Sequence, residues 1–129
     1  MSKFEKEFFQ KFDYTDEQVK QFFKNSEKDL KLATSANDPN IIYRIGYDAV
    51  LKFGIAVIAK NGYKTRSILG HHIKILNVLS DLFNVKDEIG YIHRIRRKRN
   101  IDLYEGGIDF TETEAKNLIK IIKKIFNSI

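Results

Sequence analysis

The stretch PNIIYRIGYDAVLKFGIAVIAK, residues 39–60, decides the fold expected for this chain. When it is wound as a helix, it is apolar over much of its circumference, which is typical of a helix packed on several sides. Pro39 suits the first position of a helix, and Asn61-Gly62 tolerates the left-handed cap that often ends one. The sequence therefore predicts a central helix from Pro39 to about Lys60.

A first helix is expected before this centre, from about Thr15 to Thr34. Thr15 and Gln18 have the spacing of a capping box, in which side chains satisfy backbone N–H groups at the start of a helix. The residues that follow, 35–38, read Ser-Ala-Asn-Asp and interrupt the helical pattern. A shorter helix that joins or precedes the first one is suggested by four phenylalanines: Phe4, Phe8, Phe9 and Phe12.

Three more segments follow the central helix. Residues 63–68 are interpreted as a connecting loop, and apolar residues at helical spacing then predict a third helix from about Gly70 to Phe83. A fourth helix is expected from about Lys86 to Tyr104. Thr111 and Glu114 form a second capping-box pattern, which opens the last helix. No segment requires a β-strand.

The composition agrees with a small helical domain. A chain of 129 residues with 43% apolar residues is long enough to bury a core without disulfides or metals. It has no cysteine, which removes thiol nucleophiles and is compatible with a reducing cytosol. No apolar run approaches the roughly 20 residues of a membrane helix. We therefore expect an all-α, antiparallel bundle of about five helices in one cytoplasmic domain, residues 1–129, with no metal, cofactor or membrane.

The chain is basic, with a formal net charge of +6 and a pI of about 9.4. Such a balance favours a polyanionic or acidic partner. The scattered lysines are equally well explained by a biased, lysine-rich composition. The excess is more informative on the fourth helix, where the basic residues cluster.

The fourth helix distributes its charge in an unusual way. Three aliphatic residues define the core-facing direction of a helical wheel drawn at about 100° per residue: Ile89, Ile92 and Leu103. Arg96, Arg99 and Asn100 fall on the same side of the wheel. Their angular positions are about 340°, 280° and 20° when Ile89 is at zero. The opposite side is basic and is interpreted as a solvated face: Arg94, Arg97 and Lys98.

Charge that faces inward is tolerated only with partners, or in a cleft filled by water, a ligand or another subunit. One interpretation is structural, with the arginines reaching solvent or pairing with buried carboxylates such as Asp48. The other is functional, with a polar cleft between helices or protomers that binds phosphate or nucleic acid. Arginine suits that task because its planar guanidinium matches the geometry of phosphate. The residues leave both interpretations open.

The string RRKRNIDLYEG, residues 96–106, resembles the signature helix of HEPN-family proteins. That family is marked by an arginine, a following polar residue and a histidine a few residues later. Arg99 matches the arginine, and Asn100 matches the polar residue. Three earlier strings are also similar to the family pattern: Tyr47-Asp48-Ala49, Gly62-Tyr63 and Gly70-His71-His72.

The resemblance implies a bundle of four or five helices, commonly a homodimer whose motif helices meet in a shared cleft. Many members resemble metal-independent RNA-cleaving toxins of toxin–antitoxin and defence systems, some pair with a nucleotidyltransferase, and others are non-catalytic binding modules. By this resemblance the catalytic positions are Arg99, Asn100 and Tyr104. The candidate contacts to RNA or nucleotide are Arg96, Arg97, His71 and His72.

This chain departs from the family pattern at Tyr104, which stands where the histidine is expected. A histidine can transfer a proton near neutral pH, whereas tyrosine, with an ordinary pKa of about 10, is a poor general base there. Tyr104 can still donate a hydrogen bond or stack on a base. The departure weakens the ribonuclease interpretation and leaves the fold interpretation unchanged.

The histidines offer a second source of proton transfer. His71 and His72 are adjacent, so a helix points them about 100° apart and makes them poor joint ligands for one metal. One of them either packs near the helix start or reaches the cleft of Arg99 and supplies the group that Tyr104 cannot. His93 lies at the edge of the core-facing side, where it is either a satisfied interior histidine or a residue that flanks the cleft.

Three hypotheses follow. The first is a HEPN-like protein that binds RNA or a nucleotide at a dimeric cleft on the fourth helix and that, if it is catalytic, cleaves RNA without a metal. The second is a non-catalytic helical module that partners a nucleotidyltransferase or an antitoxin. The third is a general nucleic-acid-binding protein that uses the exposed basic face, and it predicts strong salt dependence of binding.

Overall fold

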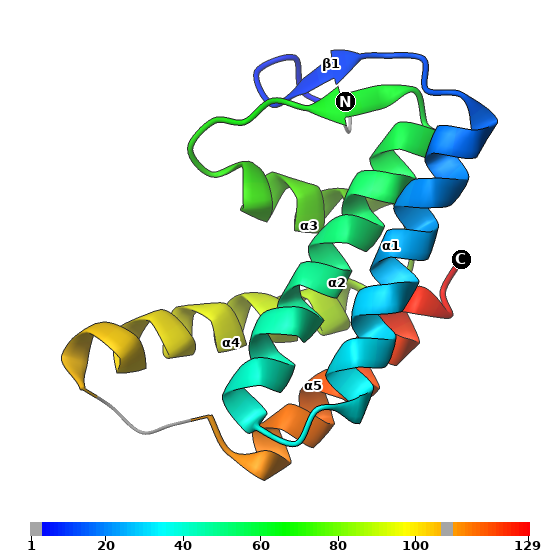
Figure 1. Ribbon diagram of the computed structural model, residues 1–129. Helices are drawn as coiled ribbons and strands as arrows, with labels where there is room; N and C mark the ends of the chain where they lie inside the picture. The colour runs from blue at the N-terminus through cyan, green and yellow to red at the C-terminus, as the bar shows by residue number, and fades with distance from the viewer. Residues whose placement is uncertain (1–3, 107–109) are drawn as a thin grey trace.

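The computed structural model describes residues 4–106 and 110–129, and for residues 101–105 it describes the backbone alone. Within that part of the chain, five helices pack together beside a small two-stranded sheet (Figure 1). The helices are α1 (Asp16–Ser35), α2 (Pro39–Lys60), α3 (His71–Leu82), α4 (Lys86–Glu105) and α5 (Glu112–Phe126). The strands are β1 (Phe9–Lys11) and β2 (Tyr63–Thr65). The expected five-helix, all-α architecture is therefore confirmed, with the sheet as an addition.

The central helix α2 has the predicted bounds and the predicted role. It carries a large share of the buried residues of the core, and α1, α3 and α5 pack around it. Two glycines allow the closest approaches. A Cβ added at Gly54 would lie 2.5 Å from Cγ2 of Ile75 on α3, and one added at Gly46 would lie 3.0 Å from Cδ1 of Ile122 on α5. The packing of α3 against α2 therefore depends on the missing side chain of Gly54.

Local capping explains where three helices begin. The Thr15 hydroxyl accepts a hydrogen bond from the backbone N–H of Gln18, whose side chain accepts one from the Thr15 N–H in return. Thr111 and Glu114 make the same reciprocal pair at the start of α5. The Asp38 side chain accepts hydrogen bonds from the first N–H groups of α2. Both predicted capping boxes are therefore confirmed.

Two expectations about the first half of the chain were wrong. Phe9–Lys11 forms strand β1 where a short helix was expected, and Tyr63–Thr65 forms strand β2 where a loop was expected. The two strands pair antiparallel, with Phe9 opposite Thr65, and the ring of Phe4 stacks on Tyr63 with centroids 4.3 Å apart. A helix this short is marginal without packing, whereas the distant aromatic and β-branched residues offer the segment a pairing partner.

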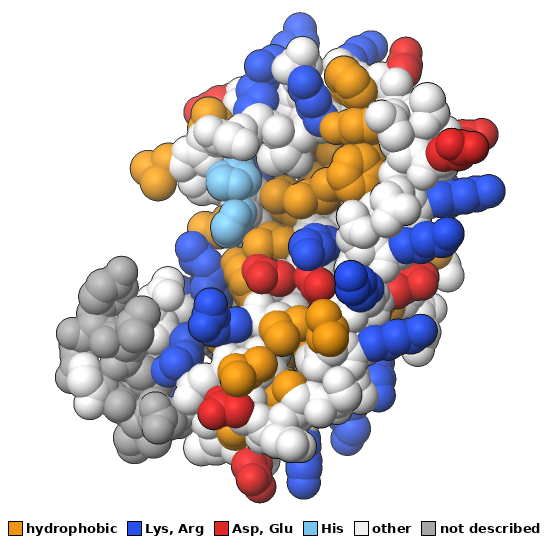
Figure 2. Space-filling model, viewed as in Figure 1, with side chains coloured by type: hydrophobic (Ala, Val, Ile, Leu, Met, Phe, Trp, Pro, Cys, Tyr) orange, Lys and Arg blue, Asp and Glu red, His pale blue; other side chains and the backbone are white. Residues whose placement is uncertain are grey.

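The helices leave one face of the molecule open. α3 and α4 extend to the same side of α2 (Figure 1), and the surface is hollowed between α3 and the described part of α4 (Figure 2). Histidine side chains lie on one edge of this hollow, and Lys or Arg side chains lie on the other (Figure 2). Among the described residues, no helix is long and apolar enough to span a membrane.

Candidate functional site

Two tyrosines of α2 lie between α3 and α4. Tyr43 and Tyr47 are four residues apart, so the helix places them on one face, and their ring centroids lie 6.0 Å apart. The ring centroid of Tyr47 lies 6.4 Å from that of His72 at the start of α3. The ring centroids of His72 and His71 lie 4.3 Å apart. These four side chains form a continuous series, called the ring row below.

The helix α4 brings Arg96 and Arg99 to the ring row. Both side chains, called the arginine pair below, are half-buried. The positive charges of the pair act on the Tyr43 phenol, and Arg96 also acts on Tyr47 and His72. Arg96 therefore lies close enough to groups on both α2 and α3 for its charge to act on them.

Burial controls the ionisation of the two tyrosines. Loss of solvent raises the pKa of Tyr47 to about 12 and also raises the pKa of Tyr43, and these effects exceed the opposing influence of Arg96. The buried Tyr47 hydroxyl has no hydrogen-bond partner of regular geometry among the described residues. The tyrosines are therefore neutral near pH 7 and do not compensate the charge of the arginines.

Asp48 does not neutralise the arginine pair. Its carboxylate is exposed on α2, and its charge acts on the tyrosines and on His72. Yet among the described residues, the ion pairs join carboxylates to lysines, and none includes Arg96 or Arg99. The arginines therefore form no ion pair with Asp48. The described part of the hollow combines neutral rings with two uncompensated guanidinium groups.

The histidines are held at the edge of the hollow by the turn that precedes them. Gly70 adopts a left-handed φ of 84°, which few other residues tolerate, and α3 begins immediately after it. The Nδ1 atom of His71 lies 2.7 Å from the carbonyl oxygen of Ile68. That oxygen can only accept, so Nδ1 donates to it. The conformation of the turn therefore orients the His71 ring.

The segment that leads into β1 also supports this turn. The backbone N–H of Arg66 donates to the carbonyl oxygen of Phe8 at 2.7 Å, and its Nε donates to the carbonyl oxygen of Lys6 at 3.0 Å. These bonds extend the β1–β2 pairing to the residues just before the histidines. The N-terminal segment thus helps to position one edge of the hollow.

His72 is the exposed member of the pair. Partial burial lowers the pKa of His72, and the neighbouring His71 and Arg96 lower it further, whereas Asp48 acts in the opposite direction. The imidazole is therefore neutral near pH 7 and can accept a proton. Its ring lies beside that of Tyr47, and the charge of Arg96 acts on it.

The remaining predicted residues have mixed outcomes. Arg97 is exposed on the basic face of α4. Asn100 was expected to face inward with Arg96 and Arg99, but its side chain is exposed. The wheel was misdirected because Ile95, which is also buried, moves the core-facing direction away from Asn100. The Tyr104 side chain lies outside the described residues.

His93 is a satisfied interior histidine. It is half-buried on α4, and its Nε2 lies 3.1 Å from Oδ1 of Asn77 on α3. Burial lowers the pKa of His93, and the charges of Arg97 and Arg96 lower it further. Its role is therefore to link α3 to α4, and it serves as a matched control for experiments on His72.

The tyrosines were missed as site residues. Tyr47 was named only as part of the string Tyr47-Asp48-Ala49, which is similar to the family pattern, and Tyr43 was not proposed as a site residue. The available signal was two phenols at a spacing of i and i+4 on an otherwise apolar helix, because such a pair lies on one face. Their contact with α4 could not be predicted, since it depends on how two helices distant in sequence pack.

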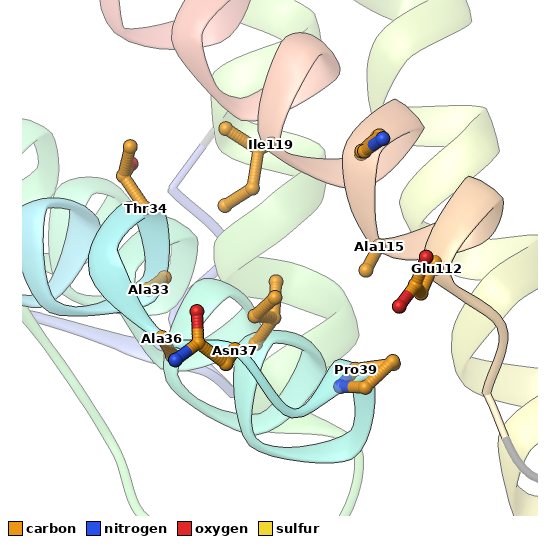
Figure 3. Close-up of a pocket in the computed structure, with 10 residues that line it drawn as sticks. Ala33, Thr34, Ala36, Asn37, Pro39, Glu112, Ala115 and Ile119 are labelled. Atoms are coloured by element: carbon orange, nitrogen blue, oxygen red, sulfur yellow. The ribbon is translucent and has the colours of Figure 1, made fainter.

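The hollow is not the only concavity among the described residues. A cavity of about 350 Å³ lies between the end of α1, the start of α2 and α5 (Figure 3). Ala33, Ala115 and Ile119 form part of its wall, with Glu112 near its rim. No arginine, histidine or aromatic residue belongs to its described lining. No three His, Asp or Glu side chains among the described residues are close enough to hold a metal ion.

Comparison with known proteins adds no relative. No protein-family model, no curated protein and no solved structure matches this chain.

Proposed function

We propose that this protein is a HEPN-like RNA-binding protein that holds an RNA strand in the hollow between α3 and α4. The observation that carries the proposal is the pairing of two half-buried arginines, which no described carboxylate compensates, with a row of four rings. A guanidinium binds phosphate through two parallel hydrogen bonds, and aromatic rings stack on unpaired bases. An RNA strand supplies both groups in alternation.

The same arrangement favours a strand over a small anion. The ring row runs from Tyr43 on α2 to His71 on α3. The rings therefore form an extended surface across two helices and not a single point of contact. Free phosphate would use the arginines alone. The HEPN resemblance supports an RNA ligand as well, and it extends the proposal to a homodimer in which the α4 helices of two protomers share the bound strand.

A second candidate function is cleavage of the bound strand without a metal. The specific observation in its favour is His72, which is exposed, neutral near pH 7 and within reach of the charge of Arg96. Its imidazole would accept the proton of a ribose 2′-hydroxyl, whose oxygen would attack the neighbouring phosphorus and form a 2′,3′-cyclic phosphate as the P–O5′ bond breaks. The imidazolium or water would then give a proton to the departing 5′-oxygen, while the arginines stabilise the charge that develops on the phosphate. The histidine would then take the role that Tyr104 cannot perform.

The binding proposal is tested with variants on the two sides of α4. We expect Arg96→Ala and Arg99→Ala each to weaken binding of a short unpaired RNA by about tenfold or more, because each removes a charge-assisted contact. The matched controls are Arg94→Ala and Arg97→Ala, whose side chains are exposed on the basic face. We expect these controls to weaken binding by less than about threefold. Fluorescence anisotropy at fixed salt measures each dissociation constant.

Two results would contradict the binding proposal. If all four variants weaken binding equally, the exposed basic face binds nucleic acid without a defined site. If the wild-type protein binds no RNA, the helical module for a nucleotidyltransferase or antitoxin becomes the better interpretation, and a stoichiometric partner should then co-purify.

The cleavage candidate has its own test. Incubation of RNA with the protein and a metal chelator should give products that depend on His72, so that His72→Gln loses at least about a hundredfold in rate. The same substitution should weaken binding by a much smaller factor than it slows cleavage, because His72 is one of four rings in the ring row. His93→Gln is the control, because His93 is engaged with Asn77. Binding without any cleavage would leave the protein as a binding module.

A further inference from the structure

A cavity adjoins the ring row, separate from the hollow between α3 and α4. It has a volume of about 240 Å³ and is lined by residues of α1, α2, β2 and the start of α3. His71 and His72 belong to its lining, and His72 also contacts Tyr47. His72 therefore belongs both to the lining of this cavity and to the ring row. Figure 2 shows apolar surface directly beside the histidine side chains.

The walls of the cavity are chemically divided. Aliphatic side chains come from α2 and α3, among them Leu51, Ile55 and Ile75, and the ring of Tyr63 comes from β2. Polar groups come from the strand and the turn after it, where Lys64 and Ser67 lie, and from the two histidines at the start of α3. Such a lining suits a flat ring with apolar faces and polar edges.

The size of the cavity narrows the choice of ligand. A cavity of roughly 150 Å³ that is lined by aliphatic and aromatic groups accommodates benzene. A volume of about 240 Å³ is larger by less than a factor of two. It therefore has room for one nucleobase. Because His72 belongs both to the lining of the cavity and to the ring row, a base in the cavity and a phosphate in the hollow can belong to one strand.

We propose that this cavity binds one unpaired nucleobase of the RNA whose phosphate lies on Arg96 and Arg99. The inference rests on the proposed function and adds a specificity to it. A paired base cannot enter, since it would first have to leave the stack and lose its partner. The protein should therefore select single-stranded or bulged RNA over a duplex of the same sequence.

The experiment fills the cavity without touching the arginines. Ile55 is half-buried and lines the cavity, and the chain contains no tryptophan, so Ile55→Trp both fills the space and introduces a fluorescent reporter. The control is Ile41→Trp on the same helix, at a position that is 47% exposed and outside the lining. Ile55→Phe is a smaller insertion that keeps the test available if the tryptophan variant does not fold.

The probes are a short unpaired RNA, the same RNA with one abasic position, and the corresponding duplex. The wild-type protein should bind the unpaired RNA about tenfold or more tightly than the duplex, and the abasic substitution at one position should cost a similar factor. The Ile55 variants should bind more weakly and lose this dependence on the base. The Ile41 control should behave as the wild type does.

The outcomes separate the two proposals. If the Ile55 variants keep wild-type affinity and still discriminate against the abasic RNA, the cavity does not hold a base and the inference is overturned. Equal binding of duplex and unpaired RNA would overturn it as well. If Arg96→Ala and Arg99→Ala leave RNA binding unchanged, the proposed function itself fails.

Discussion

The ring of His72 on α3 lies 6.4 Å from the ring of Tyr47 on α2, centroid to centroid. Three charged or titratable groups act on this histidine from the surrounding helices. His71 on α3 and Arg96 on α4 lower its pKa together with partial burial, and Asp48 on α2 opposes them. The protonation of His72 is therefore coupled to whatever anion binds beside Arg96.

This coupling predicts that RNA affinity increases as the pH falls. A phosphate bound beside Arg96 adds negative charge and raises the pKa of His72, so binding takes up a proton. Affinity should therefore rise between about pH 8 and about pH 5.5, and His72→Gln should flatten the profile. Anisotropy titrations over this range measure the slope. An unchanged slope in His72→Gln would place the titrating group elsewhere.

A second prediction concerns the contact between α2 and α3. The Cβ of an alanine at Gly54 would lie 2.5 Å from Cγ2 of Ile75, which is itself buried, so one helix must move. We expect Gly54→Ala to lower the free energy of unfolding by about 1–3 kcal/mol. In Gly90→Ala the new Cβ would make an ordinary contact, 3.6 Å from a nitrogen of Arg94. That control should stabilise the protein by about 0.5–1 kcal/mol. Urea denaturation distinguishes the two.

A third prediction concerns the link between α4 and α5. Oε2 of Glu88 lies 3.0 Å from Nζ of Lys124, and this bond, helped by a backbone hydrogen bond, lowers the pKa of Glu88 although burial acts against it. A lowered pKa stabilises the fold above the ordinary value of 4.5, and the contribution is lost as the pH falls through the folded-state pKa.

Glu88→Gln should therefore reduce the free energy of unfolding at neutral pH by about 0.5–1 kcal/mol, because the lysine of the pair is largely exposed. The difference from the wild type should shrink below about pH 4. Lys123→Gln is the matched control on the exposed side of α5. A difference that persists unchanged in acid would show that packing, and not charge, explains the loss.

A fourth prediction concerns a hydroxyl in strand β2. The Thr65 Oγ1 atom is buried, and among the described residues it has no hydrogen-bond partner. Thr65→Val removes this unsatisfied group and keeps a β-branched residue in the strand, so it should stabilise the fold by about 1 kcal/mol. In Thr34→Val the lost hydroxyl donates to the Leu30 carbonyl at 2.8 Å. No gain is expected there, and thermal unfolding compares the two.

The helices were predictable because their signals are local. The bounds of α2 follow from Pro39 and from the turn at Gly62, and the capping residues Thr15 and Thr111 lie within three positions of their partners. The strands were not predictable. Three residues show no period, and the pairing of Phe9 with Thr65 depends on the rest of the fold.

The candidate site also combines residues that a local pattern indicates with residues that depend on contacts between helices. Arg96 and Arg99 were identified because their angular position on one helix could be compared with that of Ile89 and Ile92. Asn100 failed in the same comparison, since a small error in the core-facing direction is enough to expose a residue at its margin. The tyrosines and the cavity could not be predicted, because they depend on contacts between helices.

The strand pairing also determines the order in which the molecule should assemble. Arg66 bonds to Lys6 across 60 residues of sequence, whereas α1 and α2 adjoin through a short turn. Closing a long loop has a large entropic cost before any contact repays it, so β1 should dock late in folding. Contacts formed after the rate-limiting step affect unfolding rates more than folding rates. The histidine turn should therefore be the last part of the described chain to order and the first to be lost in native-state hydrogen exchange.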